Sequence, residues 1–343
     1  MPRLLGTLIS RLLCMALVIL GVSILTFLLI HSIPGNPWQN SLQRRSLSNV
    51  SLDKVSLNAL NAQFGLDQPL AEQYVRYMIG GPDANGEFVC GAVCGNLGPS
   101  FRQRGGEVTF IIFGVPEGRT FWQSRMGYTL RLALWGFVFT ALVGIPLGIA
   151  MAIRPEALAA RAAALLLNLL TAIPNFVLGI LLIILLASGL HLIRVLPDWN
   201  QWQSWLLPVF VLSAVPMAGM ARLTQAATRE AMRGEYVRAA RAKGLGRNRV
   251  VFVHILPNAL VPIVTALIPV LIELIAGSFI VEALFGLPGI GREFWMAVQE
   301  KDFPVIMGLT LLYSLGIVLI NVLVEVAYGL IDPRMRQERR ANV

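Results

Sequence analysis

Residues 12–30 read LLCMALVILGVSILTFLLI, an apolar run without a single charged residue. The hydrocarbon core of a bilayer is about 30 Å thick, and a helix needs about 20 apolar residues to cross it. The run is too long for the apolar part of a signal peptide, and no small-x-small cleavage site follows it. We therefore interpret residues 12–33 as a retained first transmembrane helix.

Five further stretches have the length and apolar character of membrane spans: 128–153, 162–187, 205–223, 260–281 and 304–330. Hydrophobic residues occupy 56% of the 343 positions and charged residues only 14%, whereas soluble domains carry about 25% charged residues. This composition argues against disordered, disulfide-scaffold and ordinary soluble proteins. The sequence predicts an all-α polytopic membrane protein with six transmembrane helices. Several of these spans contain prolines, which are tolerated where either neighbouring helices or a water-lined path satisfies the freed backbone groups, so that a conduit is one of two interpretations: Pro174, Pro208, Pro216, Pro262 and Pro269.

The distribution of basic residues indicates the orientation of the spans. Both ends of the chain and two loops (1–11, 154–161, 221–259 and 331–343) hold 16 Lys and Arg against 5 Asp and Glu, while the rest of the chain is net acidic. Because basic loops stay on the cytosolic side, we predict that both termini are cytosolic. A nucleic-acid partner is not expected, since Tyr236 is the only aromatic residue among the basic positions of 222–249.

Residues 34–127 are too polar to be embedded and predict a small extracytoplasmic insertion between the first two helices. Turn residues dominate it, but a helix is expected over Pro69–Ile79 and a strand over Val108–Val115. Cys90 and Cys94 also lie in this insertion, and the spacing leaves open a local disulfide and, as a weak signal, a zinc site. The insertion either caps the membrane helices or offers a docking surface to a substrate-delivering partner.

Motifs of catalysis and cofactor binding are absent from the sequence. It contains no G-x-x-x-x-G-K-[ST] phosphate loop, no G-x-S-x-G, no H-E-x-x-H and no G-x-G-x-x-G. The three histidines, His31, His191 and His254, are too far apart in the sequence to predict a metal site. We therefore expect no catalytic residue, cofactor or metal on this chain.

The stretch 224–257 between the fourth and fifth spans carries the most specific pattern. Gly234 and Gly244 bracket a run of helix formers, Glu235–Lys243, that opens with an acidic residue and closes with basic ones, as the helix dipole favours. Gly244 suits a left-handed C-terminal cap. The helix is too short to be stable alone, so it packs either in a groove of another protein or on its own membrane domain. Its alanines, at 239, 240 and 242, give it a slim profile.

Several motifs of the chain resemble those of a known family. Ala239, Ala240 and Gly244, followed after ten positions by Ile255-Leu256-Pro257, resemble the EAA loop of ABC-importer permeases, with Arg238 in place of the glutamate. The run from Tyr236 to Leu245 is similar to the dipeptide/oligopeptide branch. Further similar motifs follow the same order along the chain: Ile33–Pro37, Phe64–Leu70, Gly95–Phe101, Phe285–Gly291 and Tyr328–Arg334. Residues 80–95 and 103–120 look like insertions relative to shorter members.

The resemblance implies a type I ABC-importer permease fold and the binding-protein-dependent import of di- or oligopeptides across the bacterial cytoplasmic (inner) membrane. In such importers a second homologous permease completes a heterodimer, two cytosolic ABC ATPases bind ATP and Mg, and an extracytoplasmic protein delivers the peptide. The chain then divides into 1–33, the insertion 34–127, a permease core 128–330 with the coupling loop 224–257, and a cytosolic tail 331–343. The implied ATPase-coupling residues are Glu235, Tyr236, Arg238, Ala239, Ala240, Arg241, Ala242, Lys243, Gly244, Leu256 and Pro257.

Charged residues inside the spans are a second group of candidates, because a charge in lipid is costly. Glu273 and Glu325, with Arg131 near the end of the second span, either line the passage or form ion pairs between helices. Glu282 is a candidate for an external gate together with Phe285 and the residues that follow it. The segment 290–300 predicts an amphipathic helix in the outer interface.

Other functions remain as alternatives. Within the family, the cargo could instead be nickel chelates or glutathione. An ion-coupled secondary transporter would carry inverted repeats, and we find no convincing repeat between the first and last three spans. An intramembrane enzyme would need a nucleophile-base or metal constellation that the sequence lacks.

Overall fold

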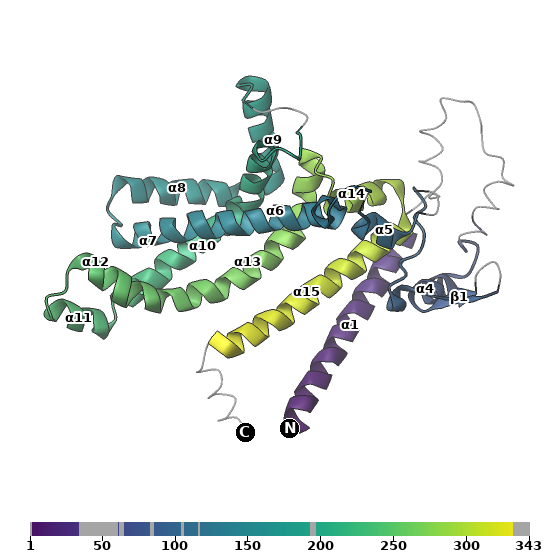
Figure 1. Cartoon of the computed structure of the whole chain (residues 1–343), viewed down its shortest axis with the longest axis horizontal. Helices are drawn as coiled ribbons and strands as arrows, with labels where there is room; N and C mark the ends of the chain where they lie inside the picture. The colour runs from purple at the N-terminus through teal and green to yellow at the C-terminus, as the bar shows by residue number, and fades with distance from the viewer. Residues whose placement is uncertain are drawn as a thin grey trace. The chain divides into compact units, whose positions relative to one another are not determined.

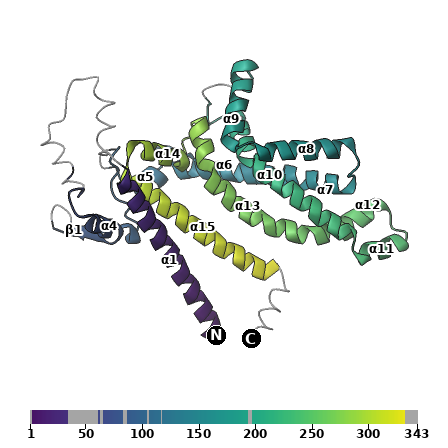
Figure 2. The same ribbon diagram turned by 180° about the vertical axis from the view of Figure 1, so that it is seen from behind.

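A computed structural model describes residues 2–33, 61, 65–82, 86–103, 106–115, 117–192 and 197–331, with the backbone alone for 2–12 and 323–331. By their contacts the residues form two compact units, Met1–Tyr128 with Pro288–Val318 and Thr129–Leu287 with Leu319–Val343. Figures 1 and 2 show the elements of both units from opposite sides. The predicted motifs at Ile33–Pro37, Phe64–Leu70 and Tyr328–Arg334 lie wholly or partly outside the described residues, and the tail lies almost wholly outside them. The predicted domain boundaries stay predictions.

The first unit combines long apolar helices with the short elements of the insertion. Its elements are α1 (Pro2–Ser32), α4 (Leu70–Met78), β1 (Gly80–Pro82), β2 (Phe88–Cys90), the single turn η1 (Ala92–Cys94), α5 (Val108–Phe113), η2 (Phe121–Gln123), the start of α6 (Arg125–Phe139), α14 (Ile290–Glu300) and the first part of α15 (Phe303–Ile331). Strands β1 and β2 pair antiparallel, with Gly80 opposite Cys90. The helices predicted at Pro69–Ile79 and 290–300 are confirmed as α4 and α14.

The strand predicted at Val108–Val115 is wrong, because the segment folds as helix α5. Val108, Ile111 and Ile112 are almost fully buried, and their i, i+3, i+4 spacing places them on one face of a helix. They share a core with residues of α1, α14 and α15, among them Ile306 and Leu309. The β-propensity of Val and Ile reflects how well they fit a half-buried sheet surface, and here burial against helices overrides it.

All regular elements in the described part of the second unit are helices. It contains most of α6, the π-helical segment η3 (Thr140–Gly144), α7 (Ile145–Ile153), α8 (Leu158–Ala172), α9 (Asn175–Ile183), the π-helical η4 (Ile184–Gly189), α10 (Gln203–Met232), α11 (Glu235–Ala242), α12 (Arg247–Arg249), the π-helical η5 (Val250–Ile255), α13 (Leu256–Phe285) and the end of α15. Helix α10 packs against most of its neighbours and carries the largest set of buried side chains. It is therefore the central helix of this unit.

Two glycines allow η3 and α7 to approach α10 closely. A Cβ on Gly148 would lie 2.4 Å from the carbonyl oxygen of Ala221, and one on Gly144 would lie 2.9 Å from that of Met217. Small residues at such contacts are typical of helix pairs in membranes, where close backbone packing replaces the hydrophobic effect as the source of attraction. The contact lies directly after Pro216 in α10, and the helix stays continuous through that proline.

Five helical segments of the described chain are long and apolar enough to cross a membrane: Leu13–Ser32, Arg125–Ile153, Gln203–Met232, Arg247–Phe285 and Phe303–Val322. The predicted third span corresponds to α8 and α9, which meet at an angle of 104°. The bend follows from Pro174, which disfavours helical geometry at the residue before it, and Ile173 is extended, with φ −101° and ψ 125°. Each of the six predicted spans thus has a helical counterpart, and the third is bent.

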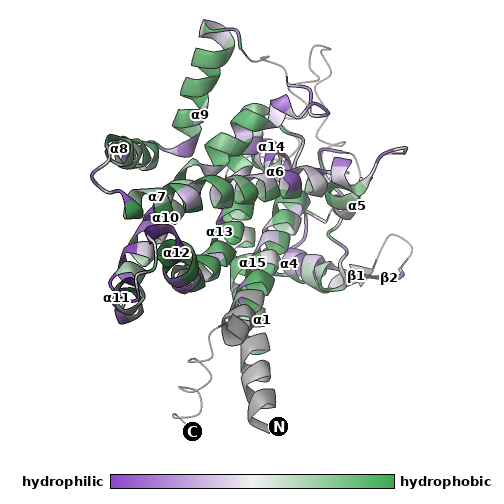
Figure 3. Ribbon diagram, turned by 60° about the vertical axis from the view of Figure 1, so that its left-hand side comes forward, coloured by the Kyte–Doolittle hydropathy of each residue, from purple (hydrophilic) through white to green (hydrophobic). Residues whose placement is uncertain are grey.

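The surfaces of these helices suit a lipid environment. Many large aliphatic residues are exposed, for example Leu17 on α1, Leu165 and Leu169 on α8 and Leu181 on α9. Figure 3 shows the long helices as predominantly hydrophobic along their length, whereas α11 carries hydrophilic stretches. Helices satisfy their own backbone hydrogen bonds and can therefore expose apolar side chains to hydrocarbon. The protein is a multi-pass membrane protein.

Candidate coupling site

Helix α11 lies at the end of α10, beside α12 (Figures 1 and 2), within the second unit. It runs from Glu235 to Ala242, one residue shorter than predicted. Val237 and Ala240 are 1% and 4% exposed, and their i, i+3 spacing gives α11 a single buried face. These two side chains belong to a core that includes Ala231 of α10 and is completed by residues of η5 and α13: Val250, Val251, Ile255, Ala259 and Ile263.

The turn between α10 and α11 is fixed by Tyr236. Its hydroxyl donates to the carbonyl oxygen of Ala231 at 2.9 Å. A Cβ on Gly234 would lie 2.4 Å from the Tyr236 ring, so only glycine fits beneath the ring without displacing it. The backbone N–H of Val237 donates to the Gly234 carbonyl at 3.0 Å. The entry angle of α11 is therefore set by contacts within the second unit.

The C-terminal end of α11 is a Schellman motif. Gly244 has a φ of +76°, the left-handed conformation that favours glycine at this position. The N–H of Leu245 donates to the Ala240 carbonyl at 3.3 Å, and the N–H of Gly244 donates to that of Arg241 at 2.9 Å. Leu245 also packs against the core that contains Ala240, which is the hydrophobic contact that accompanies this motif.

The remaining faces of α11 are exposed. Of the three alanines that the sequence predicts to contact a partner, Ala240 packs into the chain's own core, while Ala239 and Ala242 are exposed. Glu235 and Arg238 lie on the same outward face as these two alanines, and Tyr236, Arg241 and Lys243 flank it. Among the described residues, no charged side chain of α11 forms an ion pair. We call Glu235, Arg238, Ala239 and Ala242 the open face of α11.

Leu256 and Pro257 lie at the start of α13, directly after η5. Leu256 is half-buried against the same core as Val237, and Pro257 is exposed. The helical segment Arg247–Phe285 runs through Pro257 without a break, directly after the π-helical turn η5. Leu256 thus supports α11 from behind, and neither residue belongs to the open face.

The predicted pathway residues occupy different environments. Glu273 is exposed on α13, whereas Glu282, nine residues further along the same helix, is fully buried and accepts a hydrogen bond from the Ser278 hydroxyl at 2.9 Å. The two residues are nine positions apart, each with a rise of about 1.5 Å along the helix axis, so the two carboxylates do not form one site. Phe285 is the last residue of α13, and Gly286 caps it with a φ of +68°. The side chain of Glu325 lies outside the described residues.

Arg131 lies on α6 with its guanidinium 4.6 Å from the centre of the Trp205 ring, a cation–π contact within the second unit. This contact gives the charge a partner on α10, and it is neither of the two roles, pathway lining or ion pairing between helices, that the sequence left open for Arg131. The sequence offered no pattern that pairs these two residues.

The sequence reasoning missed a charged network in the first unit. Asp302 is fully buried and accepts hydrogen bonds from the Ser100 hydroxyl at 2.5 Å and from the backbone N–H groups of Phe101 and Arg102, both at 3.1 Å. Glu293 of α14 forms ion pairs with Arg102 and with Arg125, the latter at 3.1 Å. The network fastens the 100–103 turn of the insertion to α14 and α15.

The sequence pattern around Asp302 indicates a different role from the one it has in this network. Asp302 directly precedes an apolar helical run, which is typical of an N-cap, and its side chain instead binds the 100–103 turn. Nearby, Cys90 and Cys94 form a disulfide with their Cα atoms 5.9 Å apart, one of the two alternatives that the sequence left open. Among the described residues, no group of three His, Cys, Asp or Glu side chains is placed to hold a metal ion.

Comparisons with known proteins identify the family of the chain. Residues 144–337 match the family of binding-protein-dependent transport system inner membrane components, and residues 4–118 match the N-terminal region of that family. The chain is 32% identical to the dipeptide transport system permease protein DppB of Bacillus subtilis, over 97% of this chain and 98% of that protein. It is 31% identical to DppB of Escherichia coli K12, over 93% and 95% of the two chains.

A third relative carries a different cargo in its name. The glutathione transport system permease protein GsiC of Escherichia coli O6:H1 is 33% identical, over 96% of this chain and 98% of that protein. The family match covers α11, its supporting core and α13, and the relatives align over nearly the whole chain. The chain therefore belongs to the family of binding-protein-dependent transport system inner membrane components.

Proposed function

We propose that this chain is the permease subunit of an ATP-driven importer of short peptides and that α11 is its coupling helix. One observation carries the proposal: α11 is fastened to its own unit by Val237 and Ala240, while its open face has no partner among the described residues. A helix of two turns does not persist alone in water. Its position is fixed from one side only, and the other side is available to a second protein.

The way α11 is held explains how it would transmit force. Its buried face packs on α10, η5 and α13, which begin or end directly beside it. A displacement imposed on the open face therefore reaches two membrane helices through tightly packed side chains. ATP binding and the loaded delivery protein can shift the permease between states only by binding one state more tightly than the other.

The partners follow from the family and from what the sequence lacks. Without a phosphate loop, the chain would leave ATP and Mg to two ABC ATPases and act as a non-catalytic subunit. A second, homologous permease would complete the passage, and an extracytoplasmic binding protein would deliver the cargo. The basic loops 154–161 and 221–259 favour a cytosolic position for α11 and for both termini.

The contact between α11 and an ATPase can be tested by cysteine crosslinking. A Cys14→Ser background removes the free thiol and leaves the Cys90–Cys94 disulfide intact. In the complex purified in mild detergent, Ala239→Cys should crosslink to an ATPase, because residue 239 lies on the open face. Ala240→Cys is the matched control, since the neighbouring position is buried and should not crosslink.

Two outcomes would contradict the proposal. One is purification of the chain without any ATPase under conditions that keep it monodisperse. The other is an intact complex in which neither Ala239→Cys nor Ala242→Cys crosslinks to the ATPase.

Glutathione is a second candidate cargo, because GsiC is as similar to this chain as the dipeptide permeases are. Uptake of a labelled dipeptide and of labelled glutathione by the reconstituted importer, each measured separately, tells the two cargoes apart. Uptake of the dipeptide without uptake of glutathione supports the peptide assignment, and uptake of glutathione without uptake of the dipeptide replaces it.

A further inference from the structure

The first unit contains a cavity of about 300 Å³ that the proposed coupling does not use. It lies among the end of α1, α4, the β1–β2 hairpin, the 96–101 segment and the start of α15. Small-molecule sites in proteins typically enclose about 300–1,000 Å³, with mostly apolar walls and a few polar groups that fix orientation. The cavity has this composition.

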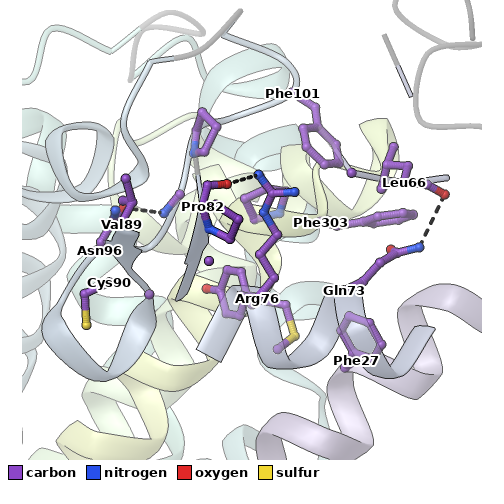
Figure 4. Close-up of a pocket in the computed structure, with 18 of the residues that line it drawn as sticks. Phe27, Leu66, Gln73, Arg76, Pro82, Val89, Cys90, Asn96, Phe101 and Phe303 are labelled. Atoms are coloured by element: carbon purple, nitrogen blue, oxygen red, sulfur yellow. Dashed lines mark hydrogen bonds between the residues drawn. The ribbon is translucent and has the colours of Figure 1, made fainter. Parts of the chain in front are cut away.

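Its apolar wall is aromatic. Phe27 of α1, Phe101 of the insertion and Phe303 of α15 all line it, and Phe101 and Phe303 meet edge to face with ring centres 6.0 Å apart. Figure 4 shows these rings on one side of Arg76, with Gln73 between Phe303 and Phe27. Pro304 and Met307 complete this side. Such a wall suits an aromatic or large aliphatic group.

Arg76 is the charged group of the cavity. Among the described residues that line it, none is acidic, and no described carboxylate forms an ion pair with Arg76. Its Nη2 donates to the Pro82 carbonyl at 3.0 Å, which holds the side chain in place and uses one of five N–H donors. Gly65 and Gly81 make room for the arginine, since a Cβ on either would lie 3.2–3.3 Å from its side chain.

Tyr77 supplies a second donor. The residue lines the same cavity, and its hydroxyl is buried and has no hydrogen-bond partner among the described residues. Burial raises the pKa of the Tyr77 hydroxyl, so the group stays protonated and can donate to an anion. A buried hydroxyl without a partner is costly, and a ligand oxygen would satisfy it. His31 and Gln73 are already bonded to each other at 3.3 Å.

We propose that this cavity binds an apolar carboxylate, the free C-terminal residue of a short peptide, with the carboxylate on Arg76 and Tyr77 and the side chain against Phe27, Phe101 and Phe303. A planar guanidinium recognises a carboxylate through two parallel hydrogen bonds, and a neutral phenol adds a third. The choice of a peptide rests on the proposed function, whereas the carboxylate chemistry rests on the cavity alone. The site lies in the first unit and does not involve α11.

The test uses two probes that differ only in charge, N-acetyl-L-phenylalanine and N-acetyl-L-phenylalaninamide, added to the purified full-length chain in detergent. Binding is measured by saturation-transfer NMR and calorimetry. The acid should bind at least about tenfold more tightly than the amide, because hydrogen bonds between charged groups are the strong ones. Equal binding of the two probes, or no binding of the acid, would overturn the proposal.

Variants assign the binding to this cavity. Arg76→Gln should weaken binding of the acid about tenfold or more and leave the amide unchanged, and Tyr77→Phe should weaken it less because it removes one uncharged donor. Arg119→Gln, an exposed arginine of the insertion outside the cavity, is the matched control for charge. Unchanged affinity of the acid in both Arg76→Gln and Tyr77→Phe would place the probe elsewhere and refute the site.

Failure of this inference can be told apart from failure of the proposed function. A chain that crosslinks to its ATPase through Ala239→Cys but binds neither probe keeps its function and lacks this site. A dipeptide that binds like N-acetyl-L-phenylalanine, while its C-terminal amide does not, identifies a peptide end as the natural source of the carboxylate. A dipeptide that does not bind would refute the peptide assignment even if the acid binds.

Discussion

Helices α11 and α14 are both short and amphipathic, and each has a glutamate in its first turn and a left-handed residue near its C-terminal end. In α14 that glutamate, Glu293, is 4% exposed and forms ion pairs with Arg102 and Arg125. In α11 it is Glu235, which is exposed and has no ion pair among the described residues. The same sequence pattern thus supports two different arrangements.

The difference lies in what covers the polar side of each helix. The 100–103 turn of the insertion reaches α14 and is bound by Asp302 at the start of α15, so the charges of α14 are satisfied within the chain. No described segment covers the open face of α11. Ion pairs and hydrogen bonds formed within the chain rigidify the first unit around α14. The open face of α11 forms no ion pair with described residues and is free to bind another protein. Substitutions should therefore act mainly on stability at α14 and mainly on coupling at α11.

The largest loss of stability is expected for Asp302→Ala. It leaves three donors, the Ser100 hydroxyl and the N–H groups of Phe101 and Arg102, without their acceptor in a buried site. The expected cost is about 3 kcal/mol or more, seen as a lower thermal midpoint of the chain in detergent and a lower abundance in the membrane.

Asp198→Ala provides the matched control for Asp302→Ala. Asp198 also accepts three hydrogen bonds, from Asn200 and Gln201, but all three are exposed. Its removal should cost about 1 kcal/mol or less, because water replaces the lost partner. Equal losses for the two variants would show that the Asp302 network is not what holds the turn.

A smaller effect is expected for Glu293→Gln, compared directly with Glu235→Gln. The first removes the charge that pairs with Arg102 and Arg125 in a mostly buried site and should destabilise the chain by about 1–3 kcal/mol. The second changes an exposed residue and should stay within about 0.5 kcal/mol. Thermal unfolding of both variants side by side decides the matter, and similar midpoints would remove the contrast between the helices.

Gly244→Val should cause the next largest loss of stability, and it should also reduce peptide transport strongly. A β-branched residue is strained at the φ of +76° that the Schellman motif requires, at a cost of about 1–2 kcal/mol. Since no other atom lies within 4 Å of a Cβ there, the strain acts on the backbone alone. The cap of α11 should loosen and peptide uptake should fall at equal membrane abundance.

Gly246→Val controls for the added side chain, since Gly246 has an ordinary φ of −61° and equally open space. Its uptake should remain close to that of the unaltered chain. Normal uptake by Gly244→Val would mean that the shape of the cap is unimportant for coupling.

Much of the fold was accessible from the sequence because the relevant signals are local. Apolar length identified the helical spans, including the one beginning at Leu12, and glycine and charge placement identified α11 and its cap at Gly244. Pro174 indicated an interruption of the third span, but the sequence did not predict that the helix bends at Ile173. These features depend on a few neighbouring residues, which is the range over which sequence patterns act.

The parts that could not be predicted depend on contacts between distant residues. Helix α5 looks like a strand by composition, and only its burial against residues near Ile306 makes it helical. Asp302 contacts a turn about 200 positions away, and the inward orientation of Ala240 depends on η5 and α13. The open face of α11 could not be told from its buried face, since Ala239 and Ala240 are identical in type.

The smallest change in stability is expected for Arg238→Glu, which nevertheless tests the comparison most directly. Arg238 is exposed on the open face and has no ion pair among the described residues, so its reversal should shift stability by no more than about 0.5 kcal/mol. If α11 binds an ATPase, a reversed charge in that contact should weaken it, because like charges at an interface are costly. ATP hydrolysis stimulated by the cargo-loaded binding protein should fall severalfold, with the thermal midpoint unchanged.

Arg154→Glu makes the same change at an exposed position of the 154–161 loop, and it should leave stimulation intact. Equal stimulation in both variants would mean that the charge of the open face plays no part in coupling, and that the difference between α11 and α14 is one of burial alone.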